Sequence, residues 1–531
     1  MLNVLIANPA LRFELDDGGE RYFFGAGCRF PWSLRKEKQS YPRFAMFPFF
    51  LGYTAALLER DEFEVKAVDG VPLNLAGKDF VQKCVEAKPD VILFEPATPA
   101  INRISAIAKD LKERTGAKIV FAGSHVTTFP REALTEHRHV DFVTIGEYEM
   151  AFLELARRLR DGKSWEDVRG IAYLDKNGDF RGGQRAPEID PVDQLPRPAR
   201  HLFPAYFDRD LARYHDGFCQ NRPAIQLHSS RGCPFRCNFC LWIQVMYNSG
   251  KHRTFSPARV VDEMIEARDR FGAREIYFDD DDFTVRKEHV VNLCNEIRRR
   301  GLRIPWSVMG DAMATDEGTL EAMAGAGCIG MKFGLESADP EVLKRIGKPI
   351  RLDRVRTVAS AAQKLGIKTH MTVMFGLSGE THQGMERTFD FACTLDVDSV
   401  QFSVATPYPG TRYYYELKDA GRLKFERWED FDGANNAVFD GEGLDPDFVE
   451  RFEASAHGRW LRHKFKNPRW VTRQMRYLGR LCRGQGVGGL YKRAARGYKL
   501  LVQPDVHHAS ATIKRPTSEA VPRQRTIGPR P

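Results

Sequence analysis

The stretch Ser230-Arg231-Gly232-Cys233-Pro234-Phe235-Arg236-Cys237-Asn238-Phe239-Cys240 contains three cysteines in a C-x3-C-x2-C spacing. The other seven cysteines of the chain are scattered singly. The triplet directly follows residues 225–228, an apolar run of the kind that forms a β-strand. Parallel α/β sheets collect their chemistry at the carboxyl ends of strands. The triplet therefore stands where such a protein would place its site.

Three thiolates on one tight loop can hold three irons of a cubane cluster. Because no fourth cysteine lies near Cys233, Cys237 and Cys240, one iron would stay open to chelate a small molecule, as in catalytic metal sites. A structural zinc site would show a second Cys or His pair. A ferredoxin-like carrier would show C-x2-C-x2-C-x3-C-P, and a third alternative is a coincidence of core cysteines. The spacing favours a 4Fe-4S cluster with one open iron.

Short apolar runs alternate with helical patterns on both sides of the cysteines, which favours parallel sheets. On the C-terminal side, strands are expected at 225–228, 275–278, 306–309, 330–334, 369–375 and 399–404, with helices at 257–271, 287–300, 316–326, 352–365 and 383–395. This series predicts a partial (β/α)6 TIM-like barrel. On the N-terminal side, strands are expected at 4–7, 64–68, 91–94, 118–122 and 142–145, with helices at 101–114 and 150–160. That series predicts a doubly wound, Rossmann-like parallel sheet.

Charge is unevenly distributed along the chain. The formal net charge is +9, yet residues 459–531 alone hold 18 Lys and Arg against 2 Asp and Glu. This basic, aromatic segment could lie on an anionic membrane surface, contact nucleic acid, or form a solvated helical lid. The N-terminus lacks a basic lead, and the apolar run 44–58 is interrupted by Pro48 and Gly52. With scattered cysteines, these features predict a cytoplasmic protein, with peripheral contact to the inner face of the membrane as an option.

Residues 225–425 resemble the radical S-adenosylmethionine (SAM) superfamily through the C-x3-C-x2-C loop. With the N-terminal sheet included, the chain resembles the subgroup with a B12-binding-like domain in front. The segment Phe239–Trp242 and residues 252–254 are similar to a branch that includes a hopanoid-biosynthesis protein. The resemblance implies five regions: a B12-binding-like Rossmann domain (1–165), a linker (166–222), the barrel (223–425), a helical region (426–503) and a disordered tail (504–531).

Several residues carry over from the family as candidate SAM contacts. Phe239 resembles the aromatic residue beside the adenine, although it could also simply pack in the core. The acidic segment 278–284 supplies Asp280 and Asp281, for which a solvated turn is the alternative. Residues 334–337 resemble the family's GxES, and 376–381 resemble GxPGET with Ser378 in place of proline; they supply Glu336, Ser337, Gly376, Gly379 and Glu380. Residues 407–411 match a PxPGT turn at the barrel lip.

The resemblance also implies a cobalamin site in the N-terminal domain. The D-x-H-x-x-G motif that would supply a histidine ligand to cobalt is absent, so other residues would cap the lower face. Candidate contacts lie in three segments that follow strands, at 95–98, 123–127 and 146–149. They include Gly123, Ser124, His125, Thr127, Gly146 and Glu147. Turn and helix-cap chemistry is the alternative interpretation of these segments.

The activity implied by the resemblance is reductive cleavage of SAM at the cluster to begin C–H radical chemistry. Cobalamin-dependent methyl transfer is the first hypothesis. A cobalamin-independent rearrangement, dehydration or cyclisation of a lipid or polyol is the second, and a non-catalytic Fe–S protein is the third. A small-molecule or lipid substrate and a flavodoxin- or ferredoxin-type electron donor are the expected partners. A specific nucleic-acid partner is not expected.

Overall fold

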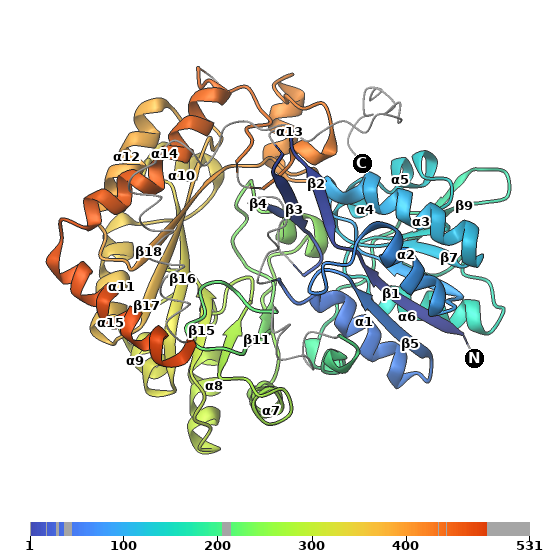
Figure 1. Ribbon diagram of the computed structural model, residues 1–531, viewed down its shortest axis with the longest axis horizontal. Coiled ribbons are helices and arrows are strands. Elements are labelled where there is room, and N and C mark those ends of the chain that lie inside the picture. Colours follow the sequence, from blue (N-terminus) through green and yellow to red (C-terminus); the bar gives the residue numbers. More distant parts are fainter. Residues whose placement is uncertain are drawn as a thin grey trace.

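A computed structural model describes residues 2–16, 18–27, 31–36, 45–203, 214–433, 435–441 and 443–485. Figure 1 shows two α/β units side by side, the N-terminal one in blue and cyan and the second in green to orange. The predicted tail 504–531 and the end of the helical region lie outside the described residues.

The N-terminal unit is built on a seven-stranded sheet of order β10-β9-β8-β7-β6-β1-β5. Its five parallel strands are β1 (Asn3–Asn8), β5 (Glu64–Asp69), β6 (Val91–Phe94), β7 (Lys118–Phe121) and β8 (Phe142–Thr144). Its helices are α1 (Phe49–Arg60), α2 (Gly77–Glu86), α3 (Ile101–Thr115), α4 (Ser124–Thr128), α5 (Pro130–Glu136) and α6 (Glu149–Arg160). The predicted doubly wound sheet is confirmed. In this strand order the direction of winding reverses between β1 and β6, where such sheets bind ligands.

Two groups of strands in the N-terminal unit were not predicted from the sequence. The antiparallel strands β2 (Leu11–Glu14), β3 (Glu20–Phe24) and β4 (Trp32–Lys36) form a small sheet between β1 and α1. The antiparallel strands β9 (Ile171–Leu174) and β10 (Phe180–Gly182) extend the main sheet within the segment predicted to be a linker. All five are short, and their pairing depends on neighbours rather than on a long apolar run.

The second unit contains six parallel strands in sequential order: β11 (Ala224–Leu227), β14 (Glu275–Phe278), β15 (Trp306–Gly310), β16 (Cys328–Glu336), β17 (Lys368–Phe375) and β18 (Ser399–Val404). Its helices are α7 (Pro257–Asp269), α8 (Lys287–Arg299), α9 (Glu317–Gly325), α10 (Pro340–Ile346), α11 (Leu352–Lys364), α12 (His382–Thr394) and α13 (Arg412–Asp419). Within the described ranges, β11 and β18 each pair with one neighbour in this sheet, so it is open on one side. The partial α/β barrel agrees with the prediction.

Half-buried and buried residues alternate strictly along β17, which distinguishes the two faces of this sheet. Met371, Val373 and Phe375 are fully buried in the apolar core. His370 and Thr372 alternate with them and are only half-buried, although β17 has a partner strand on each side. Because successive side chains of a strand point to opposite faces, the half-buried set faces the inside of the barrel.

The described part of the C-terminal region contains α14 (Pro446–Lys464) and α15 (Pro468–Gln485), both within the predicted helical region 426–503. Trp460 Nε1 donates to the carbonyl of Ala392 at 3.3 Å, and Trp470 Nε1 donates to that of Val397 at 3.1 Å. These bonds fasten both helices to the barrel beside the entry to β18. Among the described helices, none is both long and apolar enough to cross a membrane.

Candidate active site between the two units

The cysteine loop is closed at its base by a two-stranded ribbon, which we call the neck. The ribbon pairs β12 (Ser230–Arg231) with β13 (Arg253–Thr254), so that Arg231 stands opposite Arg253. Gly232 begins the loop with a φ of +92°, and a Cβ there would lie 2.0 Å from the carbonyl oxygen of Lys251. Only glycine fits this crossing of the two chain segments.

The barrel holds one side of the neck through the acidic segment after β14. The Asp280 carboxylate accepts hydrogen bonds from the Ser229 amide at 2.7 Å and from the Ser229 and Ser230 hydroxyls at 2.5 and 2.8 Å. Asp281 accepts the Gly232 amide at 2.7 Å. Burial raises the pKa of Asp280 to about 7, against the lowering effect of these bonds. In the structure these two predicted SAM contacts fasten the loop that carries the cysteines.

The N-terminal unit holds the other side of the neck through the segment after β8. Glu147 pairs with Arg231 at 3.1 Å and with Arg253 at 2.7 Å, and Glu149 pairs with Arg231 at 2.7 Å. Arg231 is fully buried, with its guanidinium 4.5 Å from the ring centroid of Phe50 on α1. Glu147, a predicted cobalamin contact, is thus bound to both arginines of the neck.

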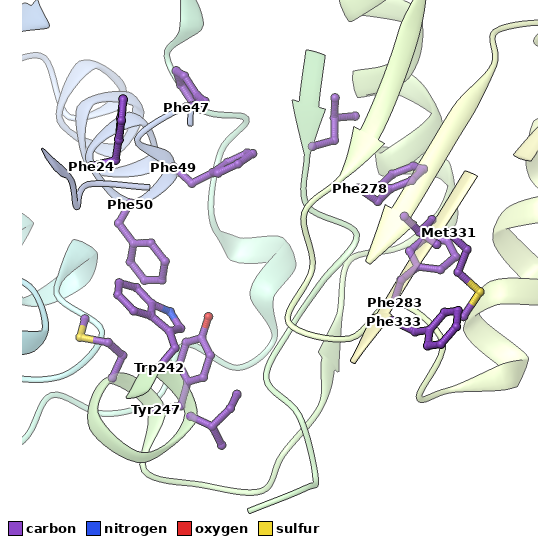
Figure 2. Packing of buried hydrophobic residues seen from close by; sticks show 14 of the residues in the cluster. Phe24, Phe47, Phe49, Phe50, Trp242, Tyr247, Phe278, Phe283, Met331 and Phe333 are labelled. Atoms are coloured by element: carbon purple, nitrogen blue, oxygen red, sulfur yellow. The ribbon is translucent and has the colours of Figure 1, made fainter. Parts of the chain in front are cut away.

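Apolar packing continues this contact between the units. Phe50 meets Trp242, just past the last cysteine, edge to face with ring centroids 5.1 Å apart. Figure 2 shows Phe50, Trp242 and Tyr247 gathered on one side of the interface, apart from the barrel residues Phe278 and Phe283. The short π-helix Ile243–Tyr247 carries this apolar surface.

The loop itself is tightly wound around the three thiols. Gln244 Nε2 donates to the carbonyls of Cys237, Asn238 and Cys240 at 3.0, 3.0 and 2.9 Å, which fixes the backbone between these cysteines. Cys237 is buried, Cys233 and Cys240 are half-buried, and burial raises the thiol pKa values of Cys233 and Cys237. Ligation to iron would hold such thiols as thiolates.

Over the described part of the chain, no three His, Cys, Asp or Glu side chains gather closely enough to share one metal ion. A cubane differs from a single ion because each thiolate binds its own iron. Three thiols on one short loop therefore fit the donor set of a cluster with one open iron.

A group of buried charges lies beside Cys237. Glu336 ends β16 with a φ of +62°, which is unusual for a residue other than glycine, and pairs with Lys348 at 2.9 Å. Burial alone would lower the pKa of Lys348, but the charges of Glu336 and Asp311 raise it overall. Burial, with the nearby charge of Asp311, raises the pKa of Asp282 to about 8. Three carboxyl groups around one lysine make a place that favours an added cation, such as a sulfonium or an ammonium group.

Asp282, Asp311 and Lys348 were not among the predicted site residues. Asp311 follows β15 directly, as the acidic segment follows β14, and this position was the available signal. Lys348 lies in the turn after α10 and carries no such signal.

The remaining predicted SAM contacts bind mostly to their own loops. Ser337 Oγ accepts the Asp339 amide at 3.1 Å at the start of α10. Glu380 accepts the Gly376 amide at 2.6 Å, and burial raises the pKa of Glu380 to about 8. Gly376 and Gly379 both have a positive φ, and Phe239 is half-buried against the core. These residues shape the loops around the cysteines.

The predicted cobalamin contacts after β7 and β8 lie together at the interface. Thr127 Oγ1 accepts the Gly146 amide at 3.1 Å, and Gly123 has a φ of +95°. His125 is buried edge to face against Trp428 and shares a hydrogen bond with the Thr98 hydroxyl at 3.2 Å. Burial lowers the pKa of His125 to about 3, so its ring is neutral. Ser124 begins α4, which contacts the π-helix Ile243–Tyr247.

A narrow cleft, with room for little more than one water molecule, opens at the switch point between β1 and β6. Asn8 and Glu95 line it from the ends of these strands, and Phe24, Gly25 and Met46 line it from the chain between β3 and α1. Glu95 belongs to the predicted segment 95–98. Tyr148 Oη donates to Glu95 Oε2 at 2.6 Å, and burial raises the pKa of Glu95 to about 8. This recess, beside a glycine and a buried carboxyl group, lies at the strand ends where doubly wound sheets bind their ligands.

Met46, which lines the cleft, contacts the barrel directly. Gln226 on β11 donates from Nε2 to Met46 Sδ at 2.8 Å and accepts the Phe47 amide at Oε1, also at 2.8 Å. Asp279 lies 3.5 Å from Gln226 Nε2 on the same inner side of the barrel. The carboxyl ends of both sheets therefore meet at one interface.

Comparison with known proteins agrees with this arrangement. The radical SAM superfamily model matches residues 227–392, and the B12-binding domain model matches residues 43–156. The uncharacterized methyltransferase PH0819 of Pyrococcus horikoshii is 33% identical over 371 residues, covering 69% of this chain and 77% of that protein. Cytidylyl-2-hydroxyethylphosphonate methyltransferase of Streptomyces wedmorensis is 28% identical over 424 residues, covering 70% and 77%.

The fold is also that of a solved structure, the radical SAM methyltransferase TsrM from Kitasatospora setae with cobalamin and a 4Fe-4S cluster bound. The TM-score is 0.63 at 18% identity, with 87% of this chain and 89% of that chain covered. The chain belongs to the radical SAM superfamily, in the group that carries a B12-binding domain. It is a radical SAM enzyme, and the cofactors of its two units are a 4Fe-4S cluster with SAM and cobalamin.

Replacing Gly232 with alanine should prevent the neck from closing, because a Cβ would collide with the Lys251 carbonyl. The expected result is a sharp fall in iron bound per chain after anaerobic reconstitution. Gly250→Ala is the matched control in the same loop, since its nearest atom would be 3.6 Å away. Full iron loading of the Gly232→Ala protein would contradict this account of the neck.

Lys348→Met should destabilise the enzyme by about 3–5 kcal/mol, because buried carboxyl groups lose their partner. Lys287→Met provides the comparison: Lys287 also forms a close carboxylate pair, with Asp316 at 2.6 Å, but both side chains are exposed. Loss of that surface pair should cost no more than about 1 kcal/mol. Chemical denaturation of both variants measures the difference, and equal losses would refute the special role of Lys348.

Proposed function

We propose that this enzyme transfers a methyl group to an unactivated carbon of a small polar molecule. The observation that carries the proposal is the position of Met46. This residue lines the switch-point cleft and contacts Gln226 on the inner side of the barrel. A cobalamin bound at this edge of the N-terminal sheet would thus face the same space as a substrate in the barrel. The methyltransferase names of the two similar relatives support this proposal.

When bound, the cluster with SAM supplies hydrogen abstraction and cobalamin supplies the methyl group. The chain's own residues position and shield these groups. Asp280 and Asp281 fix the loop of the cysteines, and the carboxyl groups beside Lys348 favour the positive charges of SAM. The buried aromatic layer around Phe50 and Trp242 excludes water from the interface.

The inner face of the barrel supports a polar substrate. His370 Nδ1 shares a hydrogen bond with the Ser399 hydroxyl at 2.9 Å, and burial holds the pKa of His370 well below its ordinary value. Lys332 is paired with Asp216 at 2.7 Å. Thr372 is half-buried and Gln401 is exposed further along the same face. A wall of polar and charged side chains suits a substrate with hydroxyl or amide groups better than a lipid.

The test uses anaerobically reconstituted enzyme with cobalamin, a strong chemical reductant and SAM labelled in its methyl group. Aqueous and organic fractions of an extract from the source organism serve as substrate sources. We expect S-adenosylhomocysteine and 5′-deoxyadenosine to form together, with the label entering a water-soluble product. Protein with Cys233, Cys237 and Cys240 replaced by alanine gives the background.

Any different result of this assay would overturn part of the proposal. A label in the organic fraction would mean a lipid substrate. 5′-Deoxyadenosine without label transfer would mean a rearrangement, dehydration or cyclisation. No cleavage of SAM beyond the background would mean a non-catalytic protein. A flavodoxin- or ferredoxin-type donor, proposed as the natural source of electrons, can replace the chemical reductant in the same assay.

We also propose that α15 rests on an anionic membrane surface. Its inner face is held by Arg473, which pairs with Asp398 at 2.7 Å. Its outer face exposes Arg469 and Arg476, with Met475 63% exposed between them. Cations around an exposed apolar side chain are typical of helices that lie at a membrane interface.

Flotation with vesicles of phosphatidylglycerol and phosphatidylcholine tests this contact. The variant Met475→Glu/Arg476→Glu should lose flotation, whereas Arg303→Glu, at an exposed position before β15, should not. Binding should weaken at high salt because exposed charges are screened. Undiminished flotation of the double variant would remove α15 from the membrane contact.

A further inference from the structure

We propose that Glu147 and Glu149 of the B12-binding domain are positioning residues for the cluster loop, and that they couple the cobalamin site to the cluster site. The inference rests on the proposed function in one respect, that cobalamin binds at the strand ends beside the switch-point cleft. It assigns to two carboxylates outside the barrel the task of holding the neck of the loop in the barrel.

The neck carries an electrostatic conflict of its own. Arg231 and Arg253 stand directly opposite each other on a ribbon of two residues per strand. Both side chains are almost entirely buried, with 0% and 4% of their surface exposed. Like charges directly opposite on paired strands are destabilising, and burial deprives them of water that would screen them.

Glu147 resolves this conflict by bridging both arginines. Its Oε1 accepts hydrogen bonds from Arg231 Nη1 and from Arg253 Nη2, each at 3.1 Å. Its Oε2 accepts one from Arg253 Nη1 at 2.7 Å and one from the Ile189 amide at 3.0 Å. Glu149 adds the second negative charge at Arg231, so two carboxylates balance two guanidinium groups.

Among the described residues of the barrel, no carboxylate forms an ion pair with Arg231 or Arg253. Its own contacts to the neck, from Asp280 and Asp281, reach the Ser229 and Ser230 hydroxyls and backbone amides instead. The charges that allow Arg231 and Arg253 to be buried therefore come from the N-terminal unit. Closure of the neck depends on docking of that unit.

The same segment reaches the cobalamin cleft through Tyr148, which lies between the two carboxylates in sequence. Tyr148 is fully buried, and its hydroxyl donates to Glu95 Oε2 at 2.6 Å. Glu95 lines the cleft at the end of β6. A continuous set of contacts thus runs from the cleft through Glu95, Tyr148 and Glu147 to the neck of the cysteine loop.

Such a set of contacts predicts reciprocal coupling. If cobalamin favours the arrangement of Glu95 and Tyr148 that holds the neck closed, a formed cluster must favour cobalamin binding by the same factor. Couplings of this kind commonly change an affinity by about 5- to 150-fold.

The experiment measures binding of hydroxocobalamin to the full-length enzyme by its absorbance change, with and without the reconstituted cluster. In the unaltered enzyme, the cluster should tighten cobalamin binding by about 5-fold or more. In Glu147→Gln this factor should fall toward one. Tyr148→Phe should lower it as well while leaving the arginine pairs and the iron content intact, which separates coupling from misfolding.

Glu188→Gln is the matched control. Glu188 also reaches the cysteine loop from outside the barrel, but its pair with Lys251 spans 3.5 Å and the lysine is 63% exposed. A screened surface pair of this kind contributes little, so the coupling factor should stay unchanged. A second readout without cobalamin is the electron paramagnetic resonance spectrum of the reduced cluster, which should change in Glu147→Gln and not in Glu188→Gln.

The outcomes separate this inference from the proposed function. Cobalamin binding that is equal with and without the cluster in the unaltered enzyme would overturn the coupling and leave methyl transfer standing. A coupling factor and a spectrum that both survive Glu147→Gln would overturn the role of the carboxylates. An enzyme that binds no cobalamin at all would overturn both proposals together.

Discussion

The structure depends on one buried electrostatic contact, between the carboxylates that follow β8 and the two arginines at the neck of the cysteine loop. Glu147, Glu149, Arg231 and Arg253 are all buried, so each charge needs an opposite charge within reach. Because the carboxylates and the arginines belong to different units, the contact fixes how the units face each other. The loop of Cys233, Cys237 and Cys240 is therefore placed by the interface as much as by the barrel that carries it.

The two sheets supply the frame that makes this contact possible. Parallel strands bring their carboxyl ends to one edge, and here the edges of both sheets meet. The small sheet β2-β3-β4 lies beside this meeting point. Phe24 at the end of β3 lines the switch-point cleft, and so does Met46 from the chain before α1. One interface therefore holds the cleft, the cysteine loop and the inner face of the barrel.

The sequence was enough to predict the parallel strands and the cysteine site. Strands β6 and β14 begin and end at the predicted residues, because every residue of both is buried and such parallel strands are largely apolar. The sequence also predicted that acidic residues lie at the ends of strands. Their partners were not, since Glu147 meets Arg231 across 84 residues of chain and nothing local encodes that distance. Asp280 and Glu147 were predicted to touch cofactors, and the structure adds that both hold the loop of the cysteines.

The neck is held by hydrogen bonds from the barrel and by ion pairs from the N-terminal unit, and the two kinds of contact have different effects. Hydrogen bonds from Asp280 and Asp281 to serine hydroxyls and backbone amides fix direction, and they form wherever the barrel folds. Ion pairs with Arg231 and Arg253 form only when the second unit is in place, because the arginines would otherwise be left buried and unpaired. A loop held in both ways completes its geometry only in the assembled protein. The reactive site is thereby built where the other cofactor domain is already present, which suits a reaction that needs both.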